Sequence, residues 1–414
     1  MRCRWAAVAV AGLLVGACSN AGPPGTGRAE TQGVTSTEIR VGSLTAATGP
    51  LGNQYAPISD GVEAYIDMIN DAGGVAGRRI KLAAKLDDAT SPSRDIAQAR
   101  ALNEQSKVFA VVGVATPVFP GAKYLGANNV PTFGWTVNPE WSGPASLFGE
   151  DGSFVDFTGA GPLLPYLAKK VGASKVGTLA YNVAQSQDCA TGQANSFRKY
   201  GLDYPFQDTS LPFGTTDINA DIQRMKQSGV QFMATCMDAT GNVLMSRGIR
   251  QNGLNITQYW PNGYDQQTLD QFPDLMEGVY LESSFTPFEA ASTSPGMEQF
   301  LSEMHRRFPR TPISEVVLAG WINAHLFVDG LKAVGRDLTR SKLIAAINNI
   351  HDFTADGIWP KQSPIDWAYS HTRLTPYPDC AAFIQVQHGR FVPVFGTPGD
   401  PFVCIDHNVT VLPS

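Results

Sequence analysis

Four side chains able to bind the charged ends of a small molecule follow predicted strands. Thr116 and Thr136 follow two strands predicted in the first half of the chain, and Asp238 and Asp265 follow two in the second half. Hydroxyls and free backbone N–H groups at helix N-termini bind a carboxylate, and an acidic side chain binds an ammonium group. Each of the four also has a structural alternative, because Thr and Asp are favoured helix caps.

Four aromatic residues are predicted in or beside loops of the same kind: Tyr55, Trp135, Tyr181 and Tyr264. Aromatic side chains bury apolar groups, and the hydroxyl or indole N–H can orient a polar one. Polar and aromatic groups divided between two halves suit a ligand that is fully contacted only when the halves close. The pattern predicts binding of a small amphipathic solute.

The sequence contains no motif of covalent or metal-assisted catalysis. Gly-x-Ser-x-Gly, His-Glu-x-x-His and a phosphate loop are all absent. The histidines are scattered without metal-ligand spacing. Asp87 and Asp88 end a predicted strand, and two carboxylates without a third ligand favour a structural turn. We expect no enzyme activity, no cofactor and no metal.

The elements that position these residues begin with a β-α-β-α unit. A strand over 39–44 leads into a Gly- and Pro-containing loop and then a helix, whose apolar face has the spacing i, i+4, i+7, i+8 and i+11 from Ile58. Gly73-Gly74 ends this helix. A second strand covers 80–86, and Ser91-Pro92 opens the next helix. This unit predicts an α/β lobe with a parallel sheet.

Strand–helix units then recur in both halves of the chain, which predicts two similar lobes. Ligands of open α/β sheets bind outside the carboxyl ends of the strands. The loops expected to face the ligand are therefore 45–55, 114–119, 134–138, 182–189, 236–241 and 261–266. A tail from about residue 370 contains two strand-like runs, 382–386 and 391–395, that predict a hairpin.

Beyond this pattern, the wording TGPLG…DGVEAYIDMIN…AGGVAGRRIKL…DDATSP over residues 48–92 resembles the type I periplasmic solute-binding proteins, and most of all those that bind branched-chain amino acids (Leu/Ile/Val). The similarity runs from about residue 38 to about 365. It implies an α/β fold of two Rossmann-like lobes with parallel sheets, joined by a hinge of three strands.

The resemblance also implies domain limits and partners. Lobe 1 is expected over 37–153 plus 284–350, and lobe 2 over 154–283 plus 351–414. The partners would be a small-molecule ligand and the permease subunits of an ABC importer, with the receptor acting as a monomer. A sensory receptor that uses the same closure to signal to a membrane partner is the alternative, and a neighbouring permease or kinase gene would separate the two.

Ser186 and Gln187 mark a departure from the family. They occupy the place where its amino-acid binders carry a Tyr in an Asp-x-Tyr-Gly run. We keep both as candidate ligand contacts, and the missing Tyr weakens the case for an ordinary branched-chain amino acid.

The N-terminus indicates export. Arg2 and Arg4 precede a short apolar stretch that ends in Leu-Val-Gly-Ala-Cys, which resembles a bacterial lipobox. We predict a signal peptide over 1–17, lipidation of Cys18, and a flexible, Gly- and Pro-containing tether over 18–36. This places the protein in the cell envelope, on the outer face of the cytoplasmic membrane or in the periplasm, held to the membrane by lipid.

The charge of the chain argues against a nucleic-acid partner. The formal net charge is −6, and loss of Arg2 and Arg4 leaves 29 basic against 37 acidic residues, a net charge of −8. Nucleic-acid binders usually carry a basic patch or stripe, which this sequence lacks.

Four cysteines remain after the signal and the lipidation site: Cys189, Cys236, Cys380 and Cys404. Outside the cytoplasm an even number favours disulfides, and four cysteines allow three pairings. We favour Cys189–Cys236 and Cys380–Cys404, because each pair lies within one continuous stretch of the same predicted lobe. A zinc site is the alternative, although no Cys-x-x-Cys spacing supports it.

Overall fold

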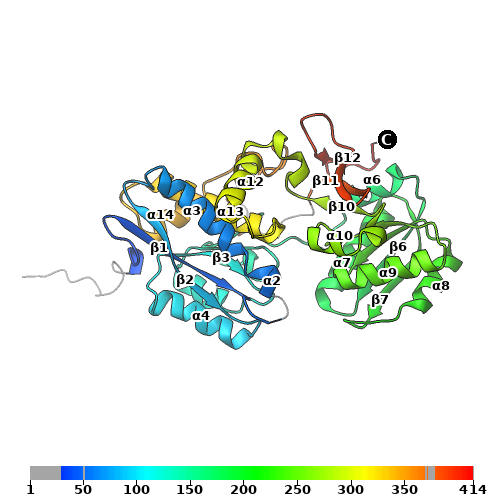
Figure 1. The fold of residues 1–414 in the computed structure, drawn as a ribbon, viewed down its shortest axis with the longest axis horizontal. Coiled ribbons are helices and arrows are strands. Elements are labelled where there is room, and N and C mark those ends of the chain that lie inside the picture. The colour runs from blue at the N-terminus through cyan, green and yellow to red at the C-terminus, as the bar shows by residue number, and fades with distance from the viewer. Residues whose placement is uncertain (1–28, 50–51, 369–370, 372–377, 414) are drawn as a thin grey trace, which may run out of the picture.

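Two lobes lie side by side, each built on one sheet with helices around it (Figure 1). This computed structural model describes residues 29–49, 52–368, 371 and 378–413. The expected α/β fold of two lobes is confirmed. The predicted signal peptide and Cys18 lie outside the described residues.

The first lobe contains a five-stranded parallel sheet in the order β2-β1-β3-β4-β5. Its strands are β1 (Glu38–Thr45), β2 (Arg79–Asp87), β3 (Ala110–Ala115), β4 (Thr132–Gly134) and β5 (Leu147–Gly149). All residues of β3 are buried, as a central strand covered on both faces requires.

Helices from two distant stretches of sequence cover this sheet. The first stretch supplies α2 (Gly52–Tyr55), α3 (Ile58–Asp71), α4 (Pro92–Glu104), α5 (Ala122–Ala127) and the short helix η1 (Pro139–Ser142). The second stretch supplies η2 (Phe288–Thr293), α12 (Pro295–Arg307), α13 (Glu315–Val334) and α14 (Arg340–Ile347). Ser91 caps α4 as predicted, accepting a hydrogen bond from the Arg94 N–H.

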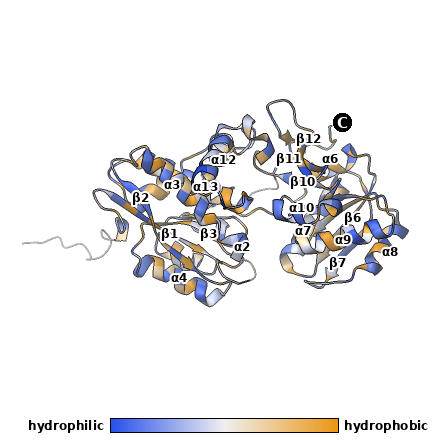
Figure 2. Cartoon of the chain, viewed as in Figure 1, coloured by the Kyte–Doolittle hydropathy of each residue, from blue (hydrophilic) through white to orange (hydrophobic). Residues whose placement is uncertain are grey.

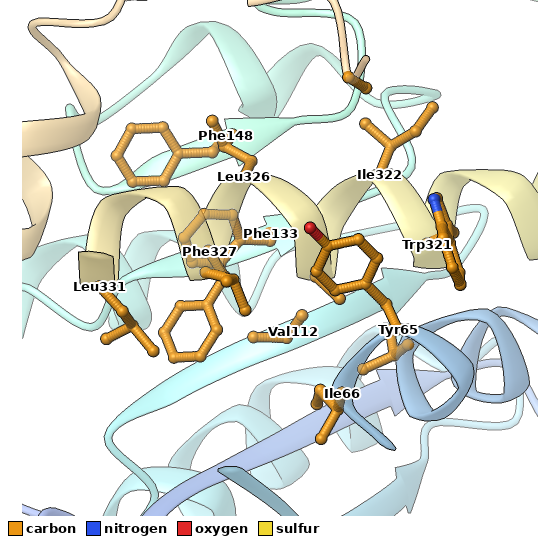
Figure 3. Close-up of a cluster of buried hydrophobic side chains, with 14 of the residues drawn as sticks. Tyr65, Ile66, Val112, Phe133, Phe148, Trp321, Ile322, Leu326, Phe327 and Leu331 are labelled. Carbon is orange, nitrogen blue, oxygen red and sulfur yellow. The ribbon is translucent and has the colours of Figure 1, made fainter. Parts of the chain in front are cut away.

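The helix α13 forms the centre of the first lobe. It is buried along most of its length, and its side chains pack against α3 and against β3, β4 and β5 (Figure 3). Tyr65 of α3 meets Trp321 edge to face, with ring centroids 4.7 Å apart. Phe327 meets Phe133 of β4 at 5.6 Å. This packing explains why a helix apolar on nearly all sides is stable here.

Two glycines let α3 and α13 approach closely. A Cβ atom on Gly61 would lie 1.9 Å from the carbonyl oxygen of Val317, and one on Gly320 would lie 2.0 Å from that of Ile58. Both distances are far shorter than atomic contact allows, so only glycine fits at these positions.

The second lobe contains a mixed sheet in the order β12-β11-β10-β9-β8-β6-β7, with β13 paired to β11. The parallel strands are β6 (Lys175–Tyr181), β7 (Asp203–Leu211), β8 (Phe232–Cys236), β9 (Thr257–Tyr259) and β10 (Tyr280–Ser283). The tail adds β11 (Cys380–Gln387), β12 (Arg390–Val394) and β13 (Val403–Cys404). The predicted hairpin is thus confirmed, and it extends the sheet with antiparallel strands.

Helices cover both faces of the second sheet as well. They are α6 (Leu163–Lys170), α7 (Ala184–Lys199), α8 (Asn219–Ser228), α9 (Ala239–Gln251), α10 (Gln266–Gln271) and α11 (Pro273–Met276). Side chains of α6 and α7 pack on one face, and those of α8 and α9 on the other. In Figure 2 these helices carry both hydrophobic and hydrophilic residues, as helices at a sheet surface do. No helix among the described residues is long and apolar enough to cross a membrane.

Two segments pack differently from the expected limits. We expected lobe 2 to resume at residue 351, but Phe353, Trp359 and Trp367 lie in the core formed by α13 and the first sheet. Their large apolar surfaces are buried there. Residues 29–36, expected within a flexible tether, also contact the first lobe: Gln32 donates to the Asn103 carbonyl at 2.8 Å.

Three connections join the lobes. The first follows β5, and the second follows β10, where the Thr286 N–H donates to the Ile358 carbonyl at 2.8 Å. The third, between Trp367 and Cys380, falls largely outside the described residues.

Both favoured disulfides are confirmed. Cys189 of α7 is bonded to Cys236, the last residue of β8, and Cys380 of β11 is bonded to Cys404 of β13. The sulfurs are therefore not available as zinc thiolates, and each bond ties two elements of the second lobe.

Gly320→Ala should destabilise the protein by about 1–3 kcal/mol, because the added methyl group overpacks the contact with Ile58. This loss outweighs the gain in helix propensity of about 1 kcal/mol for Ala over Gly. Urea unfolding measures the change. Gly248→Ala is the control, because its Cβ would meet only side-chain atoms of Ile222. Equal unfolding midpoints for Gly320→Ala and the parent would contradict the close helix contact.

Removal of the Cys189–Cys236 bond should lower the free energy of unfolding by up to about 4 kcal/mol, the chain-entropy value for residues 47 apart. Denaturation of the Cys189→Ser/Cys236→Ser double variant measures the loss. Peptide mapping of the non-reduced parent should recover the two cysteines linked to each other. Two free thiols in that map would show the pairing to be wrong.

Candidate functional site

The residues predicted to bind the ligand follow strands whose carboxyl ends share one edge of each sheet. In the first lobe they follow β1, β3 and β4, and in the second lobe β6, β8 and β9. In Figure 1, α2 of the first lobe and α7 of the second lie on the sides of the lobes that face each other. The sheet topology therefore gathers residues that are far apart in sequence.

An aromatic pair forms part of the first-lobe edge. Tyr55, the last residue of α2, meets Trp135 after β4, with ring centroids 5.3 Å apart and planes at 62°. Tyr55 is buried, and burial raises the pKa of its hydroxyl. The indole N–H of Trp135 donates to Glu315 Oε1 at 3.3 Å, which joins the loop after β4 to the first turn of α13.

The two predicted threonines of the first lobe are both buried and already hydrogen-bonded. Thr116 donates to the Val118 carbonyl at 3.0 Å and holds its own loop. Thr136 donates twice to Glu150 Oε2, from its N–H at 2.6 Å and from its hydroxyl at 2.8 Å. Neither threonine caps a helix, the structural alternative that we considered: both are held by hydrogen bonds within the loops, and Glu150 is a partner that we did not predict.

In the second lobe, Asp238 is the N-cap of α9. Its Oδ1 accepts from the Gly241 N–H at 2.9 Å and from the Tyr181 hydroxyl at 2.8 Å. Tyr181 in turn meets the exposed ring of Phe213 at 5.2 Å, edge to face. These hydrogen bonds all end at Oδ1, so Oδ2 of Asp238 can still contact a ligand.

Asp265 also caps a helix, while Tyr264 connects the loop after β9 to η2. Asp265 Oδ1 accepts from the Thr268 N–H at 2.7 Å and from its hydroxyl at 2.6 Å. The Tyr264 hydroxyl donates to Glu289 Oε2 at 2.5 Å and accepts from the Phe288 N–H at 2.9 Å. Tyr264 therefore joins the second-lobe loop to a segment that follows the second connection.

Ser186 and Gln187 lie in the first turn of α7, because this helix begins at Ala184 and not at residue 190 as we expected. Ser186 is partly buried and Gln187 is exposed. The neighbouring Cys189 is tied to the end of β8, so the disulfide fixes the start of α7 beside the exit of that strand. Free N–H groups at this helix start could bind an anion.

The structure adds two acidic residues that the sequence reasoning missed. Glu150 and Asp151 directly follow β5, and Asp151 Oδ1 is buried without a hydrogen-bond partner. Two consecutive acidic residues after a short apolar run, in the sequence LFGED, were the available signal. We overlooked them because β5 has only three residues and was not predicted.

Two acidic groups outside this region are satisfied by their own surroundings. Asp87 accepts from the N–H groups of Ala47, Thr48 and Ala89, which confirms the predicted structural turn. Among the described residues, one group has metal-ligand geometry: Asp379, Asp406 and His407 offer atoms within 4.8 Å of one another. In it, Asp379 Oδ2 lies 2.9 Å from His407 Nδ1, as in an ordinary Asp–His pair.

Curated relatives and solved structures resemble the whole molecule. The Leu/Ile/Val-binding protein homolog 7 of Brucella suis is 23% identical over 385 residues, which covers 85% of this chain and 94% of that protein. The branched-chain amino acid transporter substrate-binding protein LivJ of Streptococcus pneumoniae, in complex with isoleucine, has a TM-score of 0.69 at 21% identity and covers 86% of this chain and 100% of that one.

Structures of proteins that bind other ligands share the fold equally well. The fatty acid ABC transporter substrate-binding protein from Thermomonospora curvata has a TM-score of 0.69 at 18% identity and covers 92% of this chain and 97% of that one. A solute-binding protein from R. palustris in complex with 4-hydroxybenzoate has a TM-score of 0.69 at 20% identity and covers 86% and 95%. At these identities the likeness shows the fold and not the ligand.

A family model described as periplasmic binding protein matches residues 38–389, which span both lobes and the tail hairpin as far as Gly389. With the two-lobe fold and the expected resemblance to Leu/Ile/Val-binding proteins confirmed, the chain belongs to the family of periplasmic binding proteins.

Proposed function

We propose that this protein captures a small amphipathic solute, an amino acid or a related amide or peptide, by closure of its two lobes and delivers it to an ABC importer. Family membership supports solute binding outside the cytoplasm, and not catalysis. Solved relatives are substrate-binding proteins of ABC transporters, which supports permease subunits as partners.

The observation that carries the proposal is the division of binding groups between the two lobes. The first-lobe edge offers the Tyr55–Trp135 pair together with Thr116 and Thr136. The second-lobe edge offers Tyr181, Asp238, Tyr264 and Asp265, and the start of α7 with Ser186 and Gln187. A ligand contacted from both edges stabilises the closed state, since only closure completes its contacts.

The lipid anchor is a separate part of the proposal. The lipobox-like run that ends at Cys18 supports attachment to the outer face of the cytoplasmic membrane, with the two-lobed receptor acting as a monomer beyond its tether. Two lobes that close on one solute need no second copy of the chain.

Solute binding should raise the melting temperature of a soluble form that begins at residue 19. A ligand at 100 times its dissociation constant adds about 2.7 kcal/mol, and with unfolding entropy near 2.1 cal/mol/K per residue this corresponds to roughly 3 °C. The probes are amino acids, amides, short peptides and aromatic carboxylates. Solution scattering with each stabilising probe should show compaction, and stabilisation without compaction would contradict lobe closure.

Cys18→Ala should release the protein from the membrane, because the residue that carries the lipid is lost. Fractionation of cells followed by immunoblotting measures the distribution. Cys3→Ala serves as the control, since Cys3 lies within the predicted signal peptide and should not affect anchoring. A Cys18→Ala protein that still sediments with membranes as the parent does would disprove the anchor.

A further inference from the structure

Three acidic residues from two separate elements meet at the ligand-facing edge of the first lobe. Glu150 and Asp151 follow β5, and Glu315 is the first residue of α13. Thr136 donates to Glu150 from its N–H and its hydroxyl, while Trp135 donates to Glu315 from its indole. The loop after β4 therefore connects the acids on both elements, and it includes one member of the aromatic pair.

The carboxylates of this acidic group lack a cationic partner. Glu150 is 7% exposed, and Asp151 Oδ1 is buried with no hydrogen bond at all. Within the described part of the chain, no Lys, Arg or His forms an ion pair with any of the three. Buried carboxylates are ordinarily paired or hydrogen-bonded, because leaving one unpaired is costly.

In the absence of a bound cation, the surroundings of Glu150 and Asp151 favour the protonated, neutral form of these carboxyl groups. Burial, and then the charge of Asp151, raise the pKa of Glu150 well above its ordinary value. Burial raises the pKa of Asp151 to about 7; a hydrogen bond from the Thr136 side chain opposes this rise, and the charge of Glu315 adds to it. Among the residues that the structure describes, the charges that raise these pKa values are those of other acids, Asp151 after β5 and Glu315 of α13.

The Tyr55–Trp135 pair beside the acids is also suited to binding a cationic group. Trp135 bonds Glu315 directly, and Tyr55 packs on Trp135. Aromatic faces attract ammonium and guanidinium groups, and the attraction grows when the cation is desolvated. A cation that contacts these carboxylates and the aromatic pair would balance the charge that the described residues leave unpaired.

We propose that Glu150, Asp151 and Glu315 bind a cationic group of the solute, a primary ammonium or a guanidinium, beside the Tyr55–Trp135 pair. The assignment rests on the proposed solute-binding function and narrows it to cationic amphipathic solutes. It also assigns recognition of the solute's positive charge to the first lobe. Asp238 and Asp265, which we expected to hold an ammonium, cap α9 and α10 instead.

The assignment has a pH signature with a definite sign. In the free protein, a carboxyl whose pKa is raised from 3.8 to about 7 stabilises the fold fully below pH 4, and this contribution is lost as the pH rises toward 7. A bound cation requires the ionised form, so binding below pH 7 must release protons. The affinity for the cation should then rise up to about tenfold per pH unit for each proton released.

The test compares three probes that share one skeleton and differ in charge, together with one cationic probe of a different skeleton. L-Leucinamide keeps the ammonium, isocaproate keeps the carboxylate, isocaproamide has neither, and agmatine supplies a guanidinium with a second cation. Calorimetry and thermal shift at pH 6 and pH 8, in buffers of different ionisation enthalpy, measure affinity and proton release. We expect binding by L-leucinamide or agmatine and none by isocaproamide. Agmatine, which stays cationic at both pH values, should bind more strongly at pH 8, whereas the α-ammonium of L-leucinamide itself loses its proton near pH 8.

Glu150→Gln and Asp151→Asn should weaken cation binding tenfold or more, because each removes a charged acceptor while keeping its shape. Asp151→Asn should also raise the melting temperature of the free protein at pH 8 relative to the parent, because it removes a buried charge; a carboxylate already compensated by a cation within the protein would show no such rise. The matched control is Asp203→Asn, an exposed residue at the start of β7. It should leave both quantities unchanged.

The outcomes separate this assignment from the proposed function. Binding only by isocaproate or isocaproamide, unaffected by Glu150→Gln, preserves solute binding and overturns the cation site. Loss of cation selectivity in Asp238→Asn, but not in Glu150→Gln or Asp151→Asn, also overturns it. Binding by none of these four probes overturns the cation site, while the proposed function is tested separately by the wider set of solutes. Arg373 lies outside the described residues, and Arg373→Gln tests whether a cation of the protein itself pairs with the acids. The proposal is ruled out if this variant is less stable than the parent at pH 8 and the parent binds no cationic probe.

Discussion

Parallel pairing of strands is the constraint on which the rest of this structure depends. Because β1, β3, β4 and β5 run in one direction, the loops that follow them open at one edge of the sheet. The same holds for β6, β8 and β9 in the second lobe. Residues as distant as Tyr55, Trp135 and Glu315 meet there, and each contacts the next through a ring or a hydrogen bond.

The acidic residues near these edges fall into two physical classes. Asp238 and Asp265 have backbone N–H donors at helix starts, so their charge is balanced locally by the helix. Glu150 is bonded to Thr136, while Asp151 keeps one buried oxygen without a donor. The first class can be explained by stability alone. The second class lacks a positive charge among the described residues. This difference separates a helix-capping acid from a candidate binding group.

The segments after α14 show that the burial of large apolar residues decides which lobe a segment packs against. Residues 351–367 return to the first lobe because Phe353, Trp359 and Trp367 find a core beside α13. The tail joins the second lobe because Ile384 and Phe383 extend the buried faces of its sheet, and within the tail the disulfide from Cys404 holds β13 against β11. Each lobe therefore contains a segment that the chain reaches only after crossing between the lobes. The connections that form the hinge link the two lobes covalently.

The sequence by itself indicated the class of the fold, the start of α4 and the favoured disulfide partners. These depend on local signals: apolar periodicity over 58–69, the cap at Ser91, and cysteines within one stretch. Tertiary structure alone decided which polar groups are free and which are satisfied. Thr136 faces Glu150 and Tyr181 faces Asp238, because strand register and helix packing bring them together across 14 and 57 residues of sequence. Burial and hydrogen-bond balance are properties of such non-local contacts, so no local pattern contains them.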